Sequence, residues 1–327
     1  PIIGLREEEK KMKKRLFAAA VTLILIMLSG CSKSSSKSEA LSDTGFPVVV
    51  NGVEITAPPS RIAVLSPSLA EIISDMGFGS SVVVRSEECN YPETIAVLPS
   101  AGSVVLPDMD VIISAKPDLL LTQKEQSDSV KEILDKNNIP VVVIPAAQNF
   151  KELSNLYLAV GRMFLGANAG IIKGLTHMDF VNDKLDRINR TVLSHSGGEP
   201  QFKAVYVADL SGHVATGDSV IDHIIASAGA VNVAESLTGW KADNTTLSQP
   251  EYIFCPKSLA EKVRSIDGLK NSPAVKNNRI FEIEAEYIES QGFRMIEAAE
   301  IIAKTLYPQA FSGQTGATSE NTTTTMQ

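Results

Sequence analysis

The sequence contains residue types that perform catalysis, but they do not form a recognisable catalytic motif. Gly217-Asp218-Ser219-Val220-Ile221 begins like the turn that exposes a nucleophilic serine, yet it lacks the closing glycine. The sequence has no phosphate-binding glycine loop and no His-Glu-x-x-His pair. The four histidines show no spacing typical of a zinc or manganese site; they are His177, His195, His213 and His223. We therefore predict no catalytic residue, no metal site, no resident cofactor and no enzymatic activity.

One cysteine near the start of the chain lies in a clear chemical context. Basic residues 13–15 precede an uncharged apolar run from Leu16 to Leu28, an order typical of an export signal. As a helix, this run would rise only about 20 Å, less than the roughly 30 Å hydrocarbon core of a bilayer. The following residues, Ser29-Gly30-Cys31, complete a resemblance to the bacterial lipobox, in which the cysteine receives a lipid. We predict a signal peptide over residues 1–30, a true start at Met12 and lipidation of Cys31.

Composition excludes several classes of protein. The chain has 327 residues, 44% hydrophobic, which suits roughly two globular domains. Its formal net charge of −8 argues against nucleic-acid binding, because phosphate contacts need a surplus of Lys and Arg. Cys89 and Cys255 are the only cysteines besides Cys31, so they form at most one disulfide or remain two buried thiols.

Short apolar runs alternate with helical patterns along residues 60–308, which indicates α/β layers. Most of the runs are continuous, as buried parallel strands are. The predicted strands cover 62–65, 82–84, 119–121, 141–144, 204–207, 252–254 and 280–283. The predicted helices cover 68–76, 107–115, 126–137, 149–164, 218–228 and 292–306. We expect Ser68 to cap the first of these helices, Gly77 to end it, and Asp218 or Ser219 to cap the helix that Gly229 closes.

A single long helix is predicted over residues 167–195. Its apolar positions recur every three or four residues in one stripe; they are Ile171, Leu175, Met178, Val181, Leu185, Ile188 and Val192. A coiled-coil partner is one reading of such a stripe, and a rigid connection between two α/β halves is the other. Such a rod would measure roughly 44 Å, longer than one domain needs internally, so we favour the connection.

The two halves share a faint internal repeat, in which a proline and an acid lead into a strand at Pro117-Asp118 and again at Pro250-Glu251. Residues 247–251 show no helical pattern, so we expect no helix between the preceding loop and the strand that follows Pro250-Glu251. The predicted organisation is a Ser-rich tether at 31–45, an N-terminal lobe at 46–166, the connecting helix at 167–195, a C-terminal lobe at 196–311 and a disordered tail at 312–327.

Seven sequence fragments, in order, resemble one family. They are Arg61 to Ile72, Cys89-Asn90-Tyr91-Pro92, Leu98-Pro99 with Gly102, Lys116 to Leu120, Gly229 to Val233, Ala274 to Ile280, and Gln291 to Arg294. This series resembles the solute-binding proteins of ABC importers for iron-siderophores, haem and cobalamin. The resemblance implies two Rossmann-like lobes bridged by one long rigid helix, with the ligand in a cleft between the lobes.

The resemblance also implies where ligand and partners bind. Tyr91, Trp240 and Tyr287 are candidate aromatic residues of the cleft, because flat rings suit a corrin, a porphyrin or a catecholate; packing within a lobe is the alternative. The polar candidates for an acidic ligand lie in loops or at the ends of elements, and a solvated surface position is the alternative for each; they are Arg85, Gln123, Lys124, His213 and Arg294. Met109 joins Tyr91, Tyr287 and His213 as a possible axial ligand if the cargo is haem. Asp110 and Glu251 are the predicted docking acids for the membrane permease, Asp110 with one methylene less than the family's glutamate.

The expected protein is thus a monomeric, lipid-anchored, extracytoplasmic receptor. Its partners would be an ABC permease, its ATPase and a small metal chelate. The alternatives are a lipid-anchored hydrolase, a chelatase-like protein that handles tetrapyrroles, and an adhesive or structural lipoprotein.

Overall fold

The computed structural model describes residues 45–312 of the chain. Every described residue belongs to one compact unit. The predicted signal peptide, Cys31, nearly all of the tether and nearly all of the tail therefore lie outside the described residues, and these interpretations stay predictions.

The first sheet contains four parallel strands in the order β4-β3-β5-β6. They span Ile62–Leu65 (β3), Val82–Arg85 (β4), Leu119–Thr122 (β5) and Val141–Val143 (β6). The central strands β3 and β5 pair from Ile62–Leu119 to Leu65–Thr122 and are buried throughout. Burial on both faces explains why the sequence shows continuous apolar runs here rather than alternation.

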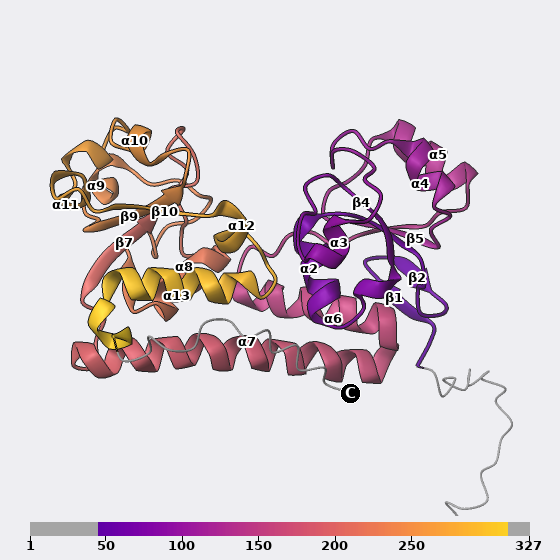
Figure 1. Cartoon of the computed structure of the whole chain (residues 1–327), viewed down its shortest axis with the longest axis horizontal. Helices are drawn as coiled ribbons and strands as arrows, with labels where there is room; N and C mark the ends of the chain where they lie inside the picture. The colour runs from indigo at the N-terminus through magenta and orange to yellow at the C-terminus, as the bar shows by residue number, and fades with distance from the viewer. Residues whose placement is uncertain (1–44, 313–327) are drawn as a thin grey trace, which may run out of the picture. The chain divides into compact units, whose positions relative to one another are not determined.

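The second sheet repeats this parallel arrangement in the order β10-β9-β7-β8. Its strands span Phe202–Tyr206 (β7), Ala230–Asn232 (β8), Tyr252–Pro256 (β9) and Ile280–Ile283 (β10). Strand β8 was not among the predicted strands, because three residues between a helix and a turn carry little periodicity. We call each sheet with the helices around it the first lobe and the second lobe (Figure 1).

The helices follow the predicted segments closely. The longer ones are α2 (Pro67–Asp75), α4 (Met109–Ser114), α5 (Asp128–Lys136), α6 (Phe150–Leu165), α7 (Ala167–Ser196), α8 (Val220–Ser227) and α13 (Arg294–Leu306). The four-residue helices are α3 (Glu93–Ala96), α9 (Asn244–Leu247), α10 (Ala260–Val263), α11 (Pro273–Lys276) and α12 (Ala285–Ile288). Short 3₁₀ turns are η1 (Gly79–Ser81), η2 (Leu269–Asn271) and η3 (Pro308–Phe311).

The ends of helices α2 and α8 can be compared with the capping residues predicted for them. The cap of α2 is Ser66 and not Ser68: its hydroxyl accepts the N–H of Leu69, and Pro67 occupies the first turn, where its missing N–H costs nothing. Ser219 caps α8 as expected, by accepting the N–H of Asp222. Gly77 follows α2 with φ of 87°.

A β-hairpin precedes the first sheet and was not predicted. Strands β1 (Val48–Val50) and β2 (Val53–Ile55) pair antiparallel around Asn51 and Gly52, whose φ values are 46° and 84°. Positive φ at both turn residues is the geometry that Asn-Gly favours and that matches the twist of the strands.

The long helix α7 extends beneath both lobes, where it packs against α6 and α13 (Figure 1). It ends at Gly197, which takes the left-handed conformation. The helices α6 and α7 approach closely through Gly161 and Gly170, because a Cβ on either residue would collide with the backbone of the other helix. The predicted 167–195 helix is therefore present, with α6 as its antiparallel neighbour.

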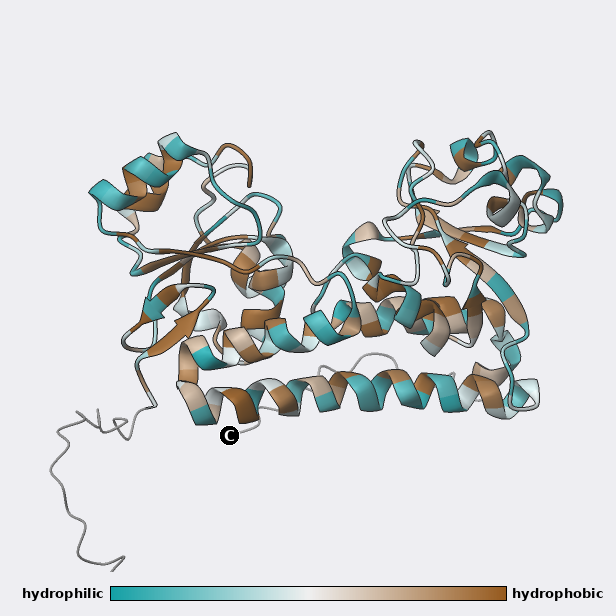
Figure 2. Ribbon diagram, turned by 180° about the vertical axis from the view of Figure 1, so that it is seen from behind, coloured by the Kyte–Doolittle hydropathy of each residue, from teal (hydrophilic) through white to brown (hydrophobic). Residues whose placement is uncertain are grey.

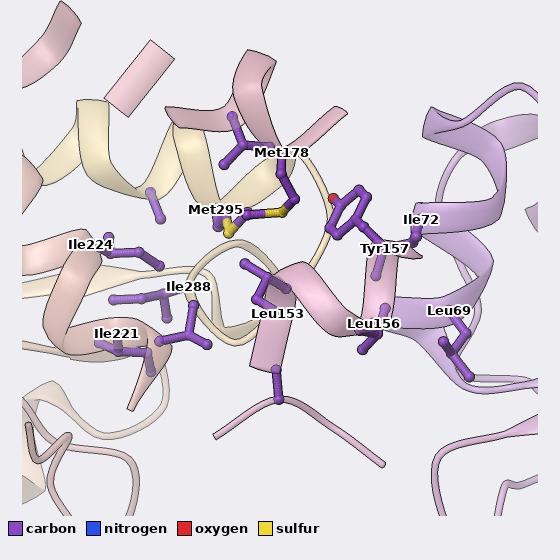
Figure 3. Packing of buried hydrophobic residues seen from close by; sticks show 14 of the residues in the cluster. Leu69, Ile72, Leu153, Leu156, Tyr157, Met178, Ile221, Ile224, Ile288 and Met295 are labelled. Atoms are coloured by element: carbon purple, nitrogen blue, oxygen red, sulfur yellow. The ribbon is translucent and has the colours of Figure 1, made fainter. Parts of the chain in front are cut away.

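One hydrophobic cluster passes through both lobes and these helices (Figure 3). It includes Leu69 and Ile72 of α2, Leu153 and Leu156 of α6, Met178 of α7, Ile221 and Ile224 of α8, Ile288 of α12 and Met295 of α13. Figure 2 shows hydrophilic residues along much of α7, whose buried positions face this cluster. The lobes thus share a core and are not joined by a flexible linker.

The proline-acid repeat has a structural role. Asp118 accepts the backbone N–H groups of Ser60 and Arg61, and Glu251 accepts the N–H of Lys203 at 2.9 Å. Asp118 thus holds the segment that leads into β3, and Glu251 holds the start of β7. The expectation of no helix before Pro250 is wrong, because the four-residue helix α9 is present with Asp243 as its cap.

Cys89 and Cys255 are both buried and free, so of the two readings the pair of buried thiols is present. Within residues 45–312, no helix combines the length and the apolar character needed to cross a membrane.

Candidate functional site

Two cavities lie between the lobes. The first, of about 300 Å³, we call the Trp240 cavity; it is lined by Ala146, Ala147, Gln148, Ala208, Val220, Ile221, Trp240, Ile288, Glu289, Ser290 and Gln291. The second, of about 440 Å³, we call the Arg294 cavity; it is lined by Pro67, Ser68, Glu88, Asn90, Ala285, Glu286, Glu289, Ser290 and Arg294. They share Glu289 and Ser290, so they form neighbouring parts of one cleft.

The fold places this cleft at the carboxyl ends of the parallel strands. Residues 146–148 follow β6, Pro67 follows β3, Ala208 follows β7 and Ala285 follows β10. In open parallel sheets the loops at this edge are free to diverge while the strands fix their positions, which makes it the usual place for a ligand. A further hollow of about 610 Å³ takes its lining from the first lobe alone.

Trp240 is held in a strained backbone conformation at the wall of its cavity. Its φ is 62°, which costs a bulky residue free energy that a glycine would not lose. Three backbone contacts maintain this conformation: the Trp240 N–H donates to Thr216 Oγ1 at 3.1 Å, the Val214 N–H donates to the Trp240 carbonyl, and Asp218 accepts the N–H of Gly239. Hydrogen bonds with residues 214–218 therefore fix the backbone of Trp240, and its half-buried indole packs against the hydrophobic cluster that the lobes share.

Glu289 presents a carboxylate to both cavities. Tyr206, fully buried at the end of β7, donates its hydroxyl to Glu289 Oε1 at 2.8 Å. Burial raises the pKa of Glu289, the Tyr206 hydrogen bond opposes this, and the charge of Glu286 adds to it. Burial also raises the pKa of Tyr206, so this hydroxyl stays a donor.

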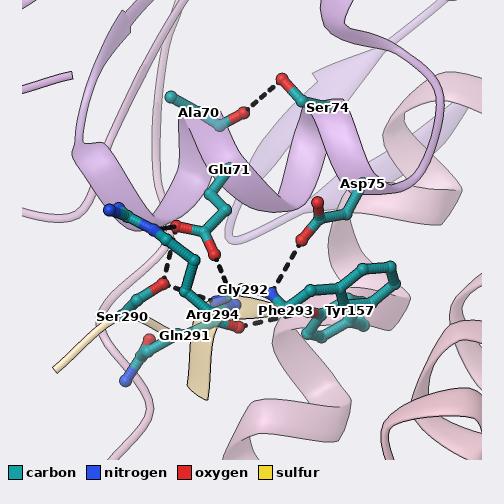
Figure 4. A network of polar contacts seen from close by, with 10 residues as sticks. All are labelled: Ala70, Glu71, Ser74, Asp75, Tyr157, Ser290, Gln291, Gly292, Phe293 and Arg294. Atoms are coloured by element: carbon teal, nitrogen blue, oxygen red, sulfur yellow. Dashed lines mark hydrogen bonds and ion pairs between the residues drawn. The ribbon is translucent and has the colours of Figure 1, made fainter. Parts of the chain in front are cut away.

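A polar network joins α2 of the first lobe to residues 290–294 of the second (Figure 4). Glu71, fully buried, accepts the Nε of Arg294 at 2.8 Å and its backbone N–H at 2.9 Å, and Ser290 donates to the same carboxylate. Gly292 is required next to Glu71, because a Cβ there would collide with the Glu71 side chain. The guanidinium of Arg294 lies 4.5 Å from the ring centre of Tyr91 and 5.8 Å from that of Tyr287.

Gln291 forms a second contact between the lobes. Its side chain donates to the Ala147 carbonyl at 2.7 Å and accepts the Ala147 N–H at 3.0 Å, as a neighbouring strand would. Gln123 donates to the same amide oxygen, and Tyr157 donates to the Gln291 carbonyl at 3.2 Å. Residues 290–294 are thus inserted between the lobes beside the cleft.

The structure brings together some of the predicted ligand residues. Trp240 and Arg294 line the two cavities, Tyr91 and Tyr287 stack on Arg294, and Gln123 contacts Gln291 beside the cleft. Of the eight candidates, only Trp240 and Arg294 line a cavity, and the remaining three lie apart from this group. Arg85 donates to the carbonyls of residues 86, 87 and 96, His213 is bonded to Asp209 at 2.6 Å, and Lys124 is exposed.

The sequence interpretation missed most of the cavity wall. Glu286 and Glu289 flank Tyr287 and Ile288 but carried no pattern of their own, and Gln148 and Ser290 lie in irregular loops. Glu71 lies in the fragment Arg61 to Ile72 and Gln291 in the fragment Gln291 to Arg294, both of which resemble the family. This resemblance is the only feature of the sequence that could have marked these two residues as functional. No group of three or more metal-ligating side chains that could hold an ion occurs in the described part of the chain.

The predicted docking acids differ in their surroundings. Asp110 is exposed in the first turn of α4. Glu251 is half-buried, and one of its carboxylate oxygens accepts the backbone N–H of Lys203. Met109 packs beside the core of the first lobe, at the start of the same helix.

Comparison with known proteins identifies the family to which this architecture belongs. Residues 62–287 match the family described as periplasmic binding protein. The chain belongs to this family. This periplasmic binding protein is 27% identical over 311 residues, 88% of its length and 96% of the relative's, to the uncharacterized ABC transporter substrate-binding lipoprotein YvrC of Bacillus subtilis.

Solved structures share the fold of this periplasmic binding protein. The haem-binding protein RhuT from Roseiflexus, in apo form, aligns with a TM-score of 0.59 and 20% identity, over 77% of this chain and 99% of that one. The structure of an ABC-type Fe3+-hydroxamate transport system from Saccharomonospora viridis aligns with a TM-score of 0.60 and 20% identity, over 80% of this chain and 99% of that one. The two lobes, parallel sheets and connecting helix predicted from the sequence are thus confirmed as this family's fold.

Proposed function

We propose that this protein is the extracytoplasmic receptor of an ABC importer, that Cys31 carries its lipid anchor, and that its ligand is an iron-siderophore, haem or a cobalamin. The observation that carries the proposal is the cleft between the lobes. Its cavities contain the indole of Trp240, whose backbone is fixed by hydrogen bonds, and polar groups from both lobes. The description of YvrC as a substrate-binding lipoprotein, and the lipobox-like Leu28 to Cys31, support the anchor and the transporter.

Binding and release would leave the chemistry of the cargo unchanged. The apolar wall of the Trp240 cavity, from Val220, Ile221 and Ile288, offers contact area to a flat chelate or to its organic shell. Delivery to a permease requires an oriented encounter, to which exposed acids such as Asp110 would contribute mainly through orientation and association rate. Glu251 is the second docking acid that we propose.

Trp240 is the only tryptophan of the chain, which provides a direct assay. We expect its fluorescence, in the chain from Ser42 to Gln327, to be quenched saturably by one class among cyanocobalamin, haemin and ferric hydroxamates. N-acetyltryptophanamide serves as the control for absorption by the ligands. The variant Trp240→Phe should lose the optical response and bind several-fold more weakly by calorimetry, since it keeps only part of the aromatic area.

Absence of heat with every chelate would contradict the proposed function. In that case, turnover of a p-nitrophenyl ester or phosphate by the same protein would favour the hydrolase alternative.

A further inference from the structure

The charges that line the cleft are unbalanced. The Arg294 cavity has three carboxylates, from Glu88, Glu286 and Glu289, and one guanidinium, from Arg294. The Trp240 cavity adds no basic residue, and Glu289 is its one charged group. By formal count, a ligand in this cleft therefore meets more negative than positive charge.

Arg294 does not correct this imbalance, because its charge already has a partner. Its Nε lies 2.8 Å from Glu71 Oε2, and both side chains are buried, with relative exposures of 9% and 0%. Two aromatic rings cover its guanidinium. A ligand anion would have to compete with a buried carboxylate for this cation, and separating a buried ion pair is strongly unfavourable.

The other basic side chains near these loops are also occupied or lie outside the cavities. Arg85 donates to three backbone carbonyls, and His213 is bonded to Asp209. Lys124 and Lys241 are exposed and line neither cavity. An anionic ligand would therefore have no cationic partner and would lie beside three carboxylates. Its binding would be disfavoured both by the loss of its hydration and by repulsion from these carboxylates.

The carboxylates are available to a ligand. Glu286 has no hydrogen bond or ion pair among the described residues, and Glu289 uses one oxygen for Tyr206 and has the other free to accept. The exposed Glu88 accepts a single N–H, that of Val104, which lies 3.2 and 3.3 Å from its two oxygens. These oxygens can accept N–H groups or pair with an ammonium, and such charge-assisted bonds are the stronger kind.

We infer that the cleft selects metal chelates by charge, binding cationic ones most tightly, neutral ones less tightly and anionic ones least. This inference rests on the proposed function and narrows its ligand class. It favours chelates that carry an amine or amide N–H at their periphery, such as hydroxamate siderophores, over polycarboxylate or triscatecholate complexes and haem with its propionates.

A charge series on one scaffold tests the inference. Ferrioxamine B carries a free ammonium, its N-acetyl derivative is neutral at that position, and its N-succinyl derivative is anionic there. We expect calorimetry on the chain from Ser42 to Gln327 to give affinities in that order, each step about tenfold, which is the effect of about 1.4 kcal/mol. The affinity for ferrioxamine B alone should fall markedly between 50 and 500 mM NaCl, on the basis of screening at a Debye length of about 10 Å at 0.1 M.

Variants assign the effect to the cleft. The double variant E286Q/E289Q keeps an acceptor oxygen for Tyr206 and should bind ferrioxamine B about tenfold more weakly, while its affinity for the acetyl derivative changes less than about twofold. Glu54→Gln, an exposed acid on β2 that lines neither cavity, is the matched control and should change neither affinity.

The outcomes separate the inference from the proposed function. An order with the anionic derivative tightest, or binding of haemin, ferric citrate or ferric enterobactin in place of the ferrioxamines, would leave the receptor function standing and overturn charge selection. Tighter binding of aquacobalamin than of neutral cyanocobalamin, with no ferrioxamine bound, would support charge selection on a corrinoid. Binding of none of these chelates would overturn both proposals.

Discussion

Asp75 links the protonation state of the protein to the contact between its lobes. Its Oδ2 accepts the N–H of Phe293 at 2.9 Å, in the segment that enters from the second lobe. Burial raises its pKa from 3.8 to about 7, the Phe293 hydrogen bond opposes this shift, and the charge of Glu71 adds to it. The carboxyl at this contact is thus half-protonated near neutral pH.

A carboxyl with a raised pKa stabilises the folded state fully below its unfolded pKa, and this contribution is lost as pH rises through about 7. We expect Asp75→Asn, which keeps an oxygen for Phe293, to raise the free energy of unfolding at pH 8 by on the order of 1–2 kcal/mol and to leave it nearly unchanged near pH 4. Urea titrations at both pH values measure this. The exposed Asp179→Asn on α7 is the control, and an equal effect of Asp75→Asn at both pH values would contradict the assignment.

The ion pair of Arg294 shows that a residue's type does not reveal which group its side chain contacts. Its basic charge made it a candidate for an acidic ligand, but its partner Glu71 is 223 residues away in sequence. Whether a side chain meets a ligand or another side chain depends on such distant contacts. The strain at Trp240 is likewise a property of the loop, which Thr216 and Val214 impose from another segment.

At the scale of elements, the sequence predicts best the boundaries of the strands that are buried along their whole length. Strand β3 ends at the predicted residues and β5 ends one residue beyond them, because both strands are buried throughout and every apolar residue of such a run is needed to fill a layer. The elements that were missed are three or four residues long, such as β8 and α9, and depend on their neighbours for stability. The close contact of α6 with α7 could not be predicted from the sequence either. A glycine such as Gly161 or Gly170 indicates a close approach only when the helix that packs against it is known.

That contact predicts a clear effect of adding one methyl group. A Cβ at Gly170 would collide with the backbone of Arg162 and Gly161. We expect Gly170→Ala to lower the free energy of unfolding by about 1–3 kcal/mol, although alanine has the higher helix propensity. Thermal unfolding measures this loss. Asn168→Ala, at an exposed position one half-turn earlier, should change stability by less than about 0.5 kcal/mol, and a stabilising Gly170→Ala would show that the helices can separate without cost.

For the whole molecule, the shared core and the inserted segment 290–294 should limit relative motion of the lobes. Moving them apart would expose apolar residues that lie in one cluster and would break the Gln291 bonds to Ala147 and Tyr157. The connection through α7 also resists bending, because an unbroken helix of 30 residues lacks a hinge. Binding should therefore proceed by small adjustments of loops at the cleft.

Small-angle scattering with and without a bound chelate tests this expectation. The radius of gyration of the chain from Ser42 to Gln327 should change by less than about 1 Å on saturation, as in other pre-organised binding sites. Gln291→Ala removes the side-chain bonds to Ala147, so it should lower the melting temperature and allow a larger change on binding. A compaction of several ångströms in the unmodified protein would mean that the lobes separate in solution, and that the contacts of Gln291 and Glu71 form only in the closed state.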